Sequence, residues 1–184
     1  MVSTETPVCN FGWKAVDFAL PGIDGETHTL DSIKGEKGTL VMFISNHCPY
    51  VKAVHKRLVR DIKELQDLGI GVIAVMPNDP TDYPADSFEN MKKVADEKGF
   101  TFPYVYDSSQ ETARAYDAVC TPDFYGFNAD MELQYRGRLD ASGRDPEAPE
   151  TRRELLEGMT QVAKTGQGPE DQTASIGCSI KWRE

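Results

Sequence analysis

The sequence predicts an α/β fold of three layers, with a sheet between two layers of helices. Two continuous apolar and β-branched runs, residues 39–44 and 70–76, are typical of strands that are covered on both faces. Between them, apolar residues from Val51 to Leu68 recur at helical spacings, with basic residues in the gaps, which predicts one amphipathic helix. A strand, a helix and a strand in this order form a right-handed crossover, so the two strands should be parallel neighbours.

Further elements are expected on both sides of this crossover. Before it, residues 16–30 indicate two short strands around a turn at Asp24–Gly25, which would add a hairpin at the start of the fold. After it, the pattern predicts a helix that Gly99 ends and a helix that Ser109 caps. The elements expected after the crossover are helices over 86–99, 109–118 and 151–165, and strands over 102–107, 123–128 and 132–139.

The chain is expected to form a single domain over residues 1–184, with its core at about 12–165. A chain of 184 residues is long enough to bury a core without disulfides or metals. Polar segments rich in glycine, proline and acidic residues, 140–150 and 165–174, are predicted loops. The second loop leads into a tail, residues 166–184, whose apolar segment "SIGCSIKW" should pack against the domain.

Composition and charge exclude several kinds of partner. The formal net charge of -10 at pH 7 argues against nucleic acid and anionic membranes as ligands. The N-terminal segment lacks the basic start and apolar stretch of a secretory signal, and no segment approaches the roughly 20 apolar residues of a membrane span, so a cytoplasmic location is expected. The four cysteines have no zinc-site spacing, so neither a metal nor another cofactor is expected. They are Cys9, Cys48, Cys120 and Cys178.

Cys48 lies where the first buried strand ends and the crossover helix begins. In open α/β sheets, this end of the strands carries the functional crevice. Pro49 suits the first helical position, so the sulfur of Cys48 should lie near free N–H groups and the positive end of the helix dipole, which both favour a thiolate. We therefore predict a reactive, partly exposed thiol with a lowered pKa, supported by His47 or Lys52. The alternative is a buried and inert cysteine.

Four motifs resemble one known superfamily. The segments "NHCPYVKA", "TPDFYGFN", "YRGRLD" and "GCSIKW", together with "VDFAL" in the leading hairpin, are similar to a peroxiredoxin-like group of the alkyl hydroperoxide reductase/thiol-specific antioxidant branch of the thioredoxin superfamily. The resemblance implies a thioredoxin-like α/β fold of the peroxiredoxin type, three layers α/β/α, with an N-terminal β-hairpin extension and a C-terminal tail. It also implies an antioxidant oxidoreductase that acts on a small thiol, peroxide or protein disulfide, uses an external thiol reductant and can form a homodimer.

The chain departs from both familiar site patterns of that superfamily. Dithiol oxidoreductases carry a second cysteine three residues after the first, where this chain has Val51. Peroxiredoxins carry a proline and a threonine or serine before the reactive cysteine, and an arginine that helps to hold the peroxide. At these three places the chain has Val41, Ser45 and Thr121. The peroxide-binding set is therefore incomplete, with Arg136 or Arg138 as possible substitutes for the arginine.

The resemblance also supplies the expected substrate-binding residues. It implies that Thr121–Pro122 is the loop whose proline is cis and faces the reactive cysteine, where its backbone groups bind an extended substrate. An ordinary turn proline is the alternative, because cis bonds are uncommon even before proline. His47, Pro49 and Tyr50 would border the same substrate.

The other cysteines leave alternatives open. Cys178 in the tail could attack a sulfenic acid or mixed disulfide on Cys48, as C-terminal resolving cysteines do, or it could be a small buried residue of a docked tail. Cys120 is either close to Cys48 or a core thiol. Cys9 is expected to be incidental near a frayed terminus, and His55, about two helical turns beyond Cys48, is expected on the surface.

Two functions are consistent with these residues. The first is a thiol oxidoreductase, in which Cys48 attacks a disulfide or a peroxide and Cys178 or an external thiol completes the cycle. The second is a non-catalytic binding module that uses the same crevice to hold an extended peptide or a small thiol.

Overall fold

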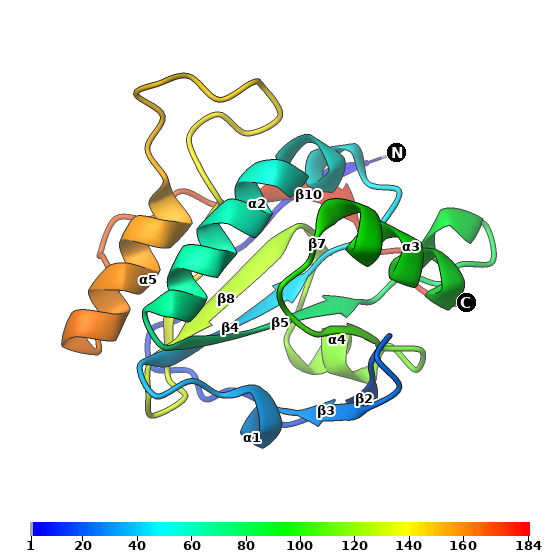
Figure 1. Ribbon diagram of the computed structural model, residues 1–184, viewed down its shortest axis with the longest axis horizontal. Coiled ribbons are helices and arrows are strands. Elements are labelled where there is room, and N and C mark those ends of the chain that lie inside the picture. Colours follow the sequence, from blue (N-terminus) through cyan, green and yellow to red (C-terminus); the bar gives the residue numbers. More distant parts are fainter. Residues whose placement is uncertain (1) are drawn as a thin grey trace.

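The computed structural model describes residues 2–184. A five-stranded sheet with the order β6-β5-β4-β8-β9 lies between helices (Figure 1). Its strands are β4 (Gly38–Phe43), β5 (Ile70–Met76), β6 (Tyr104–Tyr106), β8 (Asp123–Phe127) and β9 (Leu133–Tyr135). The first three are parallel to one another, β8 pairs antiparallel with β4, and the edge strand β9 pairs antiparallel with β8. The predicted three-layer architecture is confirmed.

The crossover forms as predicted. Helix α2 (Pro49–Asp67) connects β4 to β5, and these two strands pair in parallel from Gly38↔Ile70 to Phe43↔Val75. Every residue of β4 is buried, which is why its sequence is a continuous apolar run. Gly69 follows the helix with a φ of 93°, a conformation that glycine adopts without the steric cost of a Cβ.

Each face of the central sheet buries its own cluster of apolar side chains. On one face, Leu40 and Met42 pack with α2, α3 (Phe88–Lys98) and α5 (Glu154–Thr165). On the other face, Val41 and Phe43 pack with the short helices α1 (Leu30–Ile33) and α4 (Glu111–Ala115). The alternation of side chains along β4 therefore distributes its residues between two cores.

The leading hairpin agrees with the prediction, and two helix starts do not. Strands β2 (Ala19–Pro21) and β3 (Thr27–Thr29) pair around a turn that contains Gly25. Helix α3 begins at Phe88 rather than at residue 86, because residues 84–86 form a separate turn, η1 (Pro84–Asp86). Helix α4 is preceded by Gln110 instead of the predicted cap Ser109. The carboxylate of Asp107 accepts the Ala113 N–H at 2.8 Å and so satisfies the start of this helix.

Strand β9 is shorter than predicted because the chain beyond Tyr135 pairs with the predicted loop that follows α5. The backbone N–H of Arg136 donates to Gln172 Oε1 at 2.8 Å, and that of Arg138 donates to the Thr173 carbonyl at 2.8 Å. Residues 136–138 consequently leave the central sheet. The last helix, α5, also starts three residues later than predicted.

The two ends of the chain form a second sheet that the sequence patterns did not predict. In it, β10 (Ile176–Ser179) lies between β1 (Ser3–Glu5) and β7 (Cys120–Thr121), antiparallel to both. Figure 1 shows β10 in red beside the first turn of α2. The tail is thus docked as a strand. The expectation of a frayed N-terminus was wrong, and Cys9 is half-buried, with burial raising the pKa of its thiol to about 11.

His55 is buried, contrary to the expectation that it lies on the surface of α2. Its ring packs edge-on against Phe100, with 5.9 Å between the ring centroids. Burial, together with the nearby charges of Lys98 and Lys52, lowers the pKa of His55 to about 4. This imidazole is therefore neutral at pH 7. Within residues 2–184, none of the helices combines the length and the apolar character that crossing a lipid bilayer requires.

Candidate active site at the start of helix α2

Cys48 occupies the N-cap position of α2, as predicted, and Pro49 is the first residue of the helix. The carbonyl oxygen of Cys48 accepts the N–H groups of Val51 and Lys52 at 3.1 and 2.9 Å. The end of β4 fixes the segment before it, because the Ile44 N–H donates to the Val75 carbonyl at 3.0 Å. The sulfur is therefore held at the amide end of a 19-residue helix, where a negative charge is favoured.

The predicted partial exposure of Cys48 was wrong, because its side chain is 0% exposed. The Sγ atom lies 3.1 Å from the carbonyl oxygen of Thr121 and 2.9 Å from the Sγ atom of Cys178. Cys178 is itself only 2% exposed. The tail strand β10 thus covers the thiol that the sequence placed at the mouth of a crevice, and it brings the second candidate cysteine into contact with the first.

The strand pairing explains why Cys178 arrives at this point. Cys178 is the register partner of Thr121 on one side and of Ser3 on the other. The Thr121–Pro122 peptide bond is cis, as the resemblance implied. Thr121 is the residue whose backbone we predicted would bind an extended substrate. In this structure, the protein's own tail occupies that edge and presents Cys178 to Cys48.

Gly177 permits this close approach of the tail to the cis-proline loop. A Cβ atom on Gly177 would lie 2.0 Å from the Thr121 carbonyl oxygen, a distance at which a backbone atom must move. The glycine of "GCSIKW" is therefore required by the packing of β10 on β7.

We expect Gly177→Ala to expose Cys48. Overpacking typically costs 1–3 kcal/mol, so the displaced strand should raise the alkylation rate of Cys48 by iodoacetamide about 10- to 100-fold in the folded protein. Peptide mapping of the alkylated protein by mass spectrometry measures that rate. Ile176→Ala is the matched control, because Ile176 is exposed on the same strand. An unchanged rate for Gly177→Ala would show that β10 does not control access to the thiol.

The environment of Cys178 keeps its thiol protonated. Burial raises the pKa of Cys178 to about 12, and the neighbouring Cys48 sulfur contributes to the increase. Lys181 and the backbone N–H of Tyr50, which donates to the Cys178 sulfur, act in the opposite direction but are weaker. At pH 7 this sulfur is an S–H group, so it has to lose a proton before or during any attack on Cys48.

Cys120 lies in the same sheet but has the environment of a core thiol. It is fully buried on β7, and its sulfur is 3.7 Å from the carbonyl oxygen of Pro122. Burial and the nearby carboxylate of Asp123 raise the pKa of Cys120 well above its ordinary value. Of the two alternatives left open for Cys120, the inert thiol fits these surroundings better.

Asp86, the first residue of the helix predicted over 86–99, lies next to the cysteine site. Its carboxylate is 0% exposed and accepts the N–H groups of Asn46 and His47 at 2.8 and 3.1 Å. It also accepts the Asn78 side-chain amide at 2.9 Å and lies 2.5 Å from His47 Nδ1. Burial alone would raise the pKa of Asp86, but these hydrogen bonds hold it below its ordinary value. No local sequence signal distinguishes Asp86 from a solvated first-turn acid.

Both arginines predicted as substitutes in a peroxide site are engaged in ion pairs. Arg136 forms two hydrogen bonds with Asp123, at 3.3 and 3.0 Å. Arg138 pairs with Glu154, with a shortest distance of 2.7 Å. These partners account for both guanidinium groups, which leaves the peroxide-binding set incomplete.

A cavity of about 260 Å³ lies between the first turns of α2, the cis-proline loop and the start of β10. Tyr50 and Pro122, two of the residues predicted to border a substrate, line it together with Arg144 and Ile176. His47 does not line it and instead contacts Asp86 and Tyr83. Within residues 2–184, no group of three or more His, Cys, Asp and Glu side chains is placed to hold a metal ion.

The parallel crossover, the cysteine at the helix start and the cis-proline loop facing it define a thioredoxin-fold thiol protein. The model of the AhpC/TSA family matches residues 11–137, so the chain belongs to that family. A thiol-dependent redox function is the general function that this membership supports.

Solved structures agree with this assignment. A crystal structure of an uncharacterized conserved protein from Geobacillus kaustophilus has a TM-score of 0.93 and 44% identity, over 100% of this chain and 97% of that chain. A hypothetical protein from Sinorhizobium meliloti 1021 has a TM-score of 0.92 and 33% identity, over 98% of both chains. The thioredoxin domain of a thiol-disulfide oxidoreductase from Bacteroides vulgatus, with a TM-score of 0.58, 18% identity and coverage of 71% and 89%, is similar in fold. No curated protein is significantly similar to the chain.

Proposed function

We propose that the protein is a cytoplasmic thiol oxidoreductase in which Cys48 and Cys178 alternate between a dithiol and an intramolecular disulfide. The observation that carries the proposal is the 2.9 Å separation of the two sulfur atoms at the start of α2. The helix terminus favours a thiolate on Cys48, and Cys178 is close enough for a disulfide to form after a small shift. A dithiol pair thus exists here without a second cysteine in the helix itself.

The proposed reaction is thiol–disulfide exchange with a small or protein disulfide. The Cys48 thiolate attacks one sulfur of the substrate, a bond forms between them, and the other substrate sulfur leaves as a thiolate that takes a proton. Cys178 loses its proton and attacks the Cys48 sulfur, and the remaining substrate sulfur leaves as a thiol. The substrate disulfide gains two electrons and two protons. An external thiol reductant restores the dithiol by the reverse exchange.

This cycle requires β10 to move. Cys48 is fully buried beneath the tail, and the backbone edge of Thr121 is paired with Cys178. A disulfide large enough to carry two organic groups therefore reaches Cys48 only after β10 separates from β7. The occupied edge also weighs against the second function considered from the sequence, a permanently open module for an extended peptide.

Peroxide reduction is a second candidate, and membership of the AhpC/TSA family favours it. In this reaction, the O–O bond of a hydroperoxide breaks, Cys48 becomes a sulfenic acid and an alcohol or water leaves. Cys178 then displaces water to form the same disulfide. Val41 and the ion-paired Arg136 and Arg138 provide no conventional peroxide contacts, so disulfide exchange is preferred.

A disulfide map of the oxidised protein tests the proposal. The reduced protein is treated with a limiting amount of hydrogen peroxide or of a small disulfide, and its cysteine links are identified by mass spectrometry. The expected product links Cys48 to Cys178, and a variant that lacks Cys9 and Cys120 should give the same product. A link between Cys48 and Cys120, or no intramolecular link, would contradict the proposed pair.

A further inference from the structure

The proposed cycle does not yet account for the buried His47–Asp86 pair beside the cysteines. The imidazole of His47 is 10% exposed, and its Nε2 atom is buried with no hydrogen-bond partner among residues 2–184. Its Nδ1 atom lies 2.5 Å from Asp86 Oδ2. Because the pKa of Asp86 is lowered, the carboxylate is ionised and accepts the Nδ1 proton, which leaves Nε2 as the atom that can gain or lose a proton.

Asp86 connects the segments that carry the two cysteines. On one side, its Oδ1 atom accepts the backbone N–H groups of Asn46 and His47, directly before Cys48. On the other side, Asn78 donates to Asp86 Oδ2 and accepts the Lys181 backbone N–H at 2.9 Å. Lys181 is three residues beyond Cys178. One buried carboxylate therefore fixes the imidazole relative to both the helix start and the tail.

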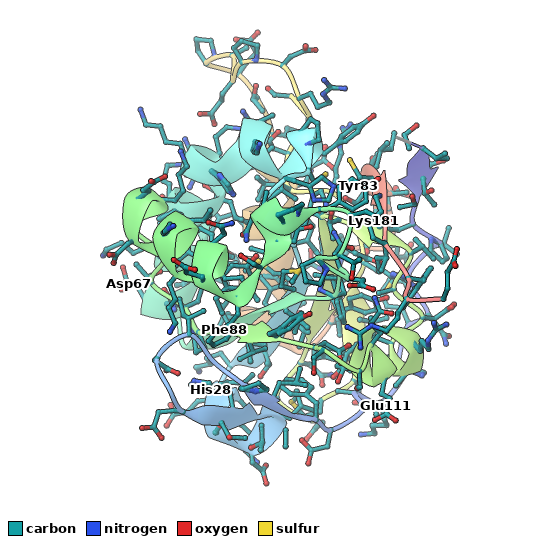
Figure 2. The ribbon with its side chains drawn as sticks, turned by 90° about the vertical axis from the view of Figure 1, so that its right-hand side faces the viewer. His28, Asp67, Tyr83, Phe88, Glu111 and Lys181 are labelled. Carbon is teal, nitrogen blue, oxygen red and sulfur yellow. The ribbon has the colours of Figure 1, made fainter. Side chains whose placement is uncertain are left out.

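The side chains around His47 come from the tail after Cys178 and from the turn that carries Asp86. The ring stacks on Tyr83 with 4.4 Å between centroids, and Lys181 Nζ lies 5.4 Å from the centroid of Tyr83. Figure 2 shows Tyr83 and Lys181 next to each other. The titratable and charged groups next to the ring, directly or through Tyr83, are Asp86, Tyr83 and Lys181. In the chain, the ring lies between Asn46, which accepts the Tyr104 hydroxyl, and Cys48, whose sulfur contacts Cys178. Asp86 is the anion in hydrogen-bond contact with the imidazole.

Attack by Cys178 needs a proton acceptor, because this thiol is protonated at pH 7. His47 directly precedes Cys48, whose sulfur lies 2.9 Å from that of Cys178. Histidine is the side chain that ordinarily changes charge between about pH 5 and 8, and an imidazole oriented by a carboxylate is a common general base. His55, which lies within α2, is buried against Phe100, and its Nε2 atom has no hydrogen-bond partner among the described residues.

We propose that His47 accepts the proton of Cys178 when the Cys48–Cys178 bond forms, and that Asp86 is the residue that positions His47. The inference rests on the proposed function. The Cys178 S–H bond breaks, its proton moves to His47 Nε2, and the sulfur attacks Cys48. The substrate sulfur then leaves Cys48 with the electron pair of the broken S–S bond. It takes the proton from His47 when it departs as a thiol.

Rapid mixing of the reduced protein with the chromogenic disulfide 5,5′-dithiobis(2-nitrobenzoate) tests this role. Attack by Cys48 releases one coloured thiolate, and attack by Cys178 on the mixed disulfide releases the second, so the two steps are observed separately. In a variant that lacks Cys9 and Cys120 but keeps Cys48 and Cys178, each protein molecule should release two equivalents of the coloured thiolate. The second rate should rise with pH, as expected for a step that needs a proton acceptor.

His47→Asn separates proton transfer from structure, because its amide retains an N–H donor for Asp86 but lacks the Nε2 atom. We expect the second release to slow on the order of 100-fold and to change its dependence on pH, while the first release remains. Asp86→Asn should slow the second release by a smaller factor and shift the pH at which it rises. His55→Asn is the matched control and should retain both wild-type rates.

The outcomes distinguish this inference from the proposed function. The His47→Asn protein could release both coloured thiolates, the second with the wild-type rate and pH profile. That result would overturn the role of His47 and leave the proposed cysteine pair intact. A wild-type protein that releases only one equivalent would instead overturn Cys178 as the second thiol. Circular dichroism and thermal unfolding of each variant verify that the fold is retained.

Discussion

Cys48→Ser is expected to abolish disulfide reduction, whereas Cys178→Ser is expected to stop the cycle after its first step. Serine is a far weaker nucleophile than a thiolate, so turnover without Cys48 should fall on the order of 1,000-fold or more. Without Cys178, Cys48 can still attack the substrate, but the thiol that contacts its sulfur and would displace the bound sulfur is missing. The mixed disulfide on Cys48 should therefore accumulate.

Steady-state reduction and intact mass measure these two results. The Cys178→Ser protein should gain the mass of one substrate half, and added small thiol should remove it and partly restore turnover. Cys120→Ser is the control, because Cys120 contacts Pro122 and has the pKa of a core thiol. Full turnover of Cys178→Ser without an added small thiol would exclude Cys178 as the resolving residue.

Asp123→Ala is expected to have the largest effect on stability of any single change near the site. Asp123 directly follows the cis-proline loop, is fully buried and forms two hydrogen bonds with the buried Arg136. Removal of the carboxylate leaves the guanidinium buried over the ring of Tyr125, 4.4 Å from its centroid, without its counter-charge. Loss of one partner from such a pair costs about 3–5 kcal/mol of unfolding free energy.

Urea denaturation measures this change. Asp31→Ala, which removes an exposed carboxylate beside Lys34, is the control and should change stability by less than ~0.5 kcal/mol. A double variant, Asp123→Leu with Arg136→Met, removes both charges and should recover most of the lost stability. A loss below about 1 kcal/mol for Asp123→Ala would mean that the ion pair is not held out of water.

The local parts of the fold were predictable from the sequence. The apolar run of β4, the helical spacing from Val51 onward and the glycines at 69 and 99 act over a few residues, and each formed the expected element. The N-cap position of Cys48 follows from the same local signals. Pro49 marks the first residue of the helix, and the end of the apolar run marks the end of the strand.

The second sheet was not predictable because its pairing is non-local. β1 has three residues and β10 has four, too few for a periodic pattern, and they come from opposite ends of the chain. Their register depends on the close approach of Gly177 to Thr121, which exists only after the domain has folded. For this reason the sequence predicted an exposed Cys48, and the structure has the tail covering it.

The role of Asp86 was hidden for a related reason. An acidic residue just before a serine cap is typical of an exposed helix start, and Ser87 does cap α3. Burial of Asp86 depends on donors from three separate segments, at Asn46, His47 and Asn78. Only the tertiary arrangement brings these donors together around one carboxylate.

The central claim is that Cys48 and Cys178 form one redox couple. The direct test equilibrates the protein in glutathione buffers of graded redox potential and quenches each sample with acid. The free thiols are then alkylated under denaturing conditions, and the alkylated fraction of each cysteine is measured by mass spectrometry. Cys48 and Cys178 are predicted to lose alkylation together, along one curve with one midpoint, while Cys120 remains alkylated. Separate curves for the two residues, or a Cys178 that stays fully alkylated while Cys48 is oxidised, would contradict the claim.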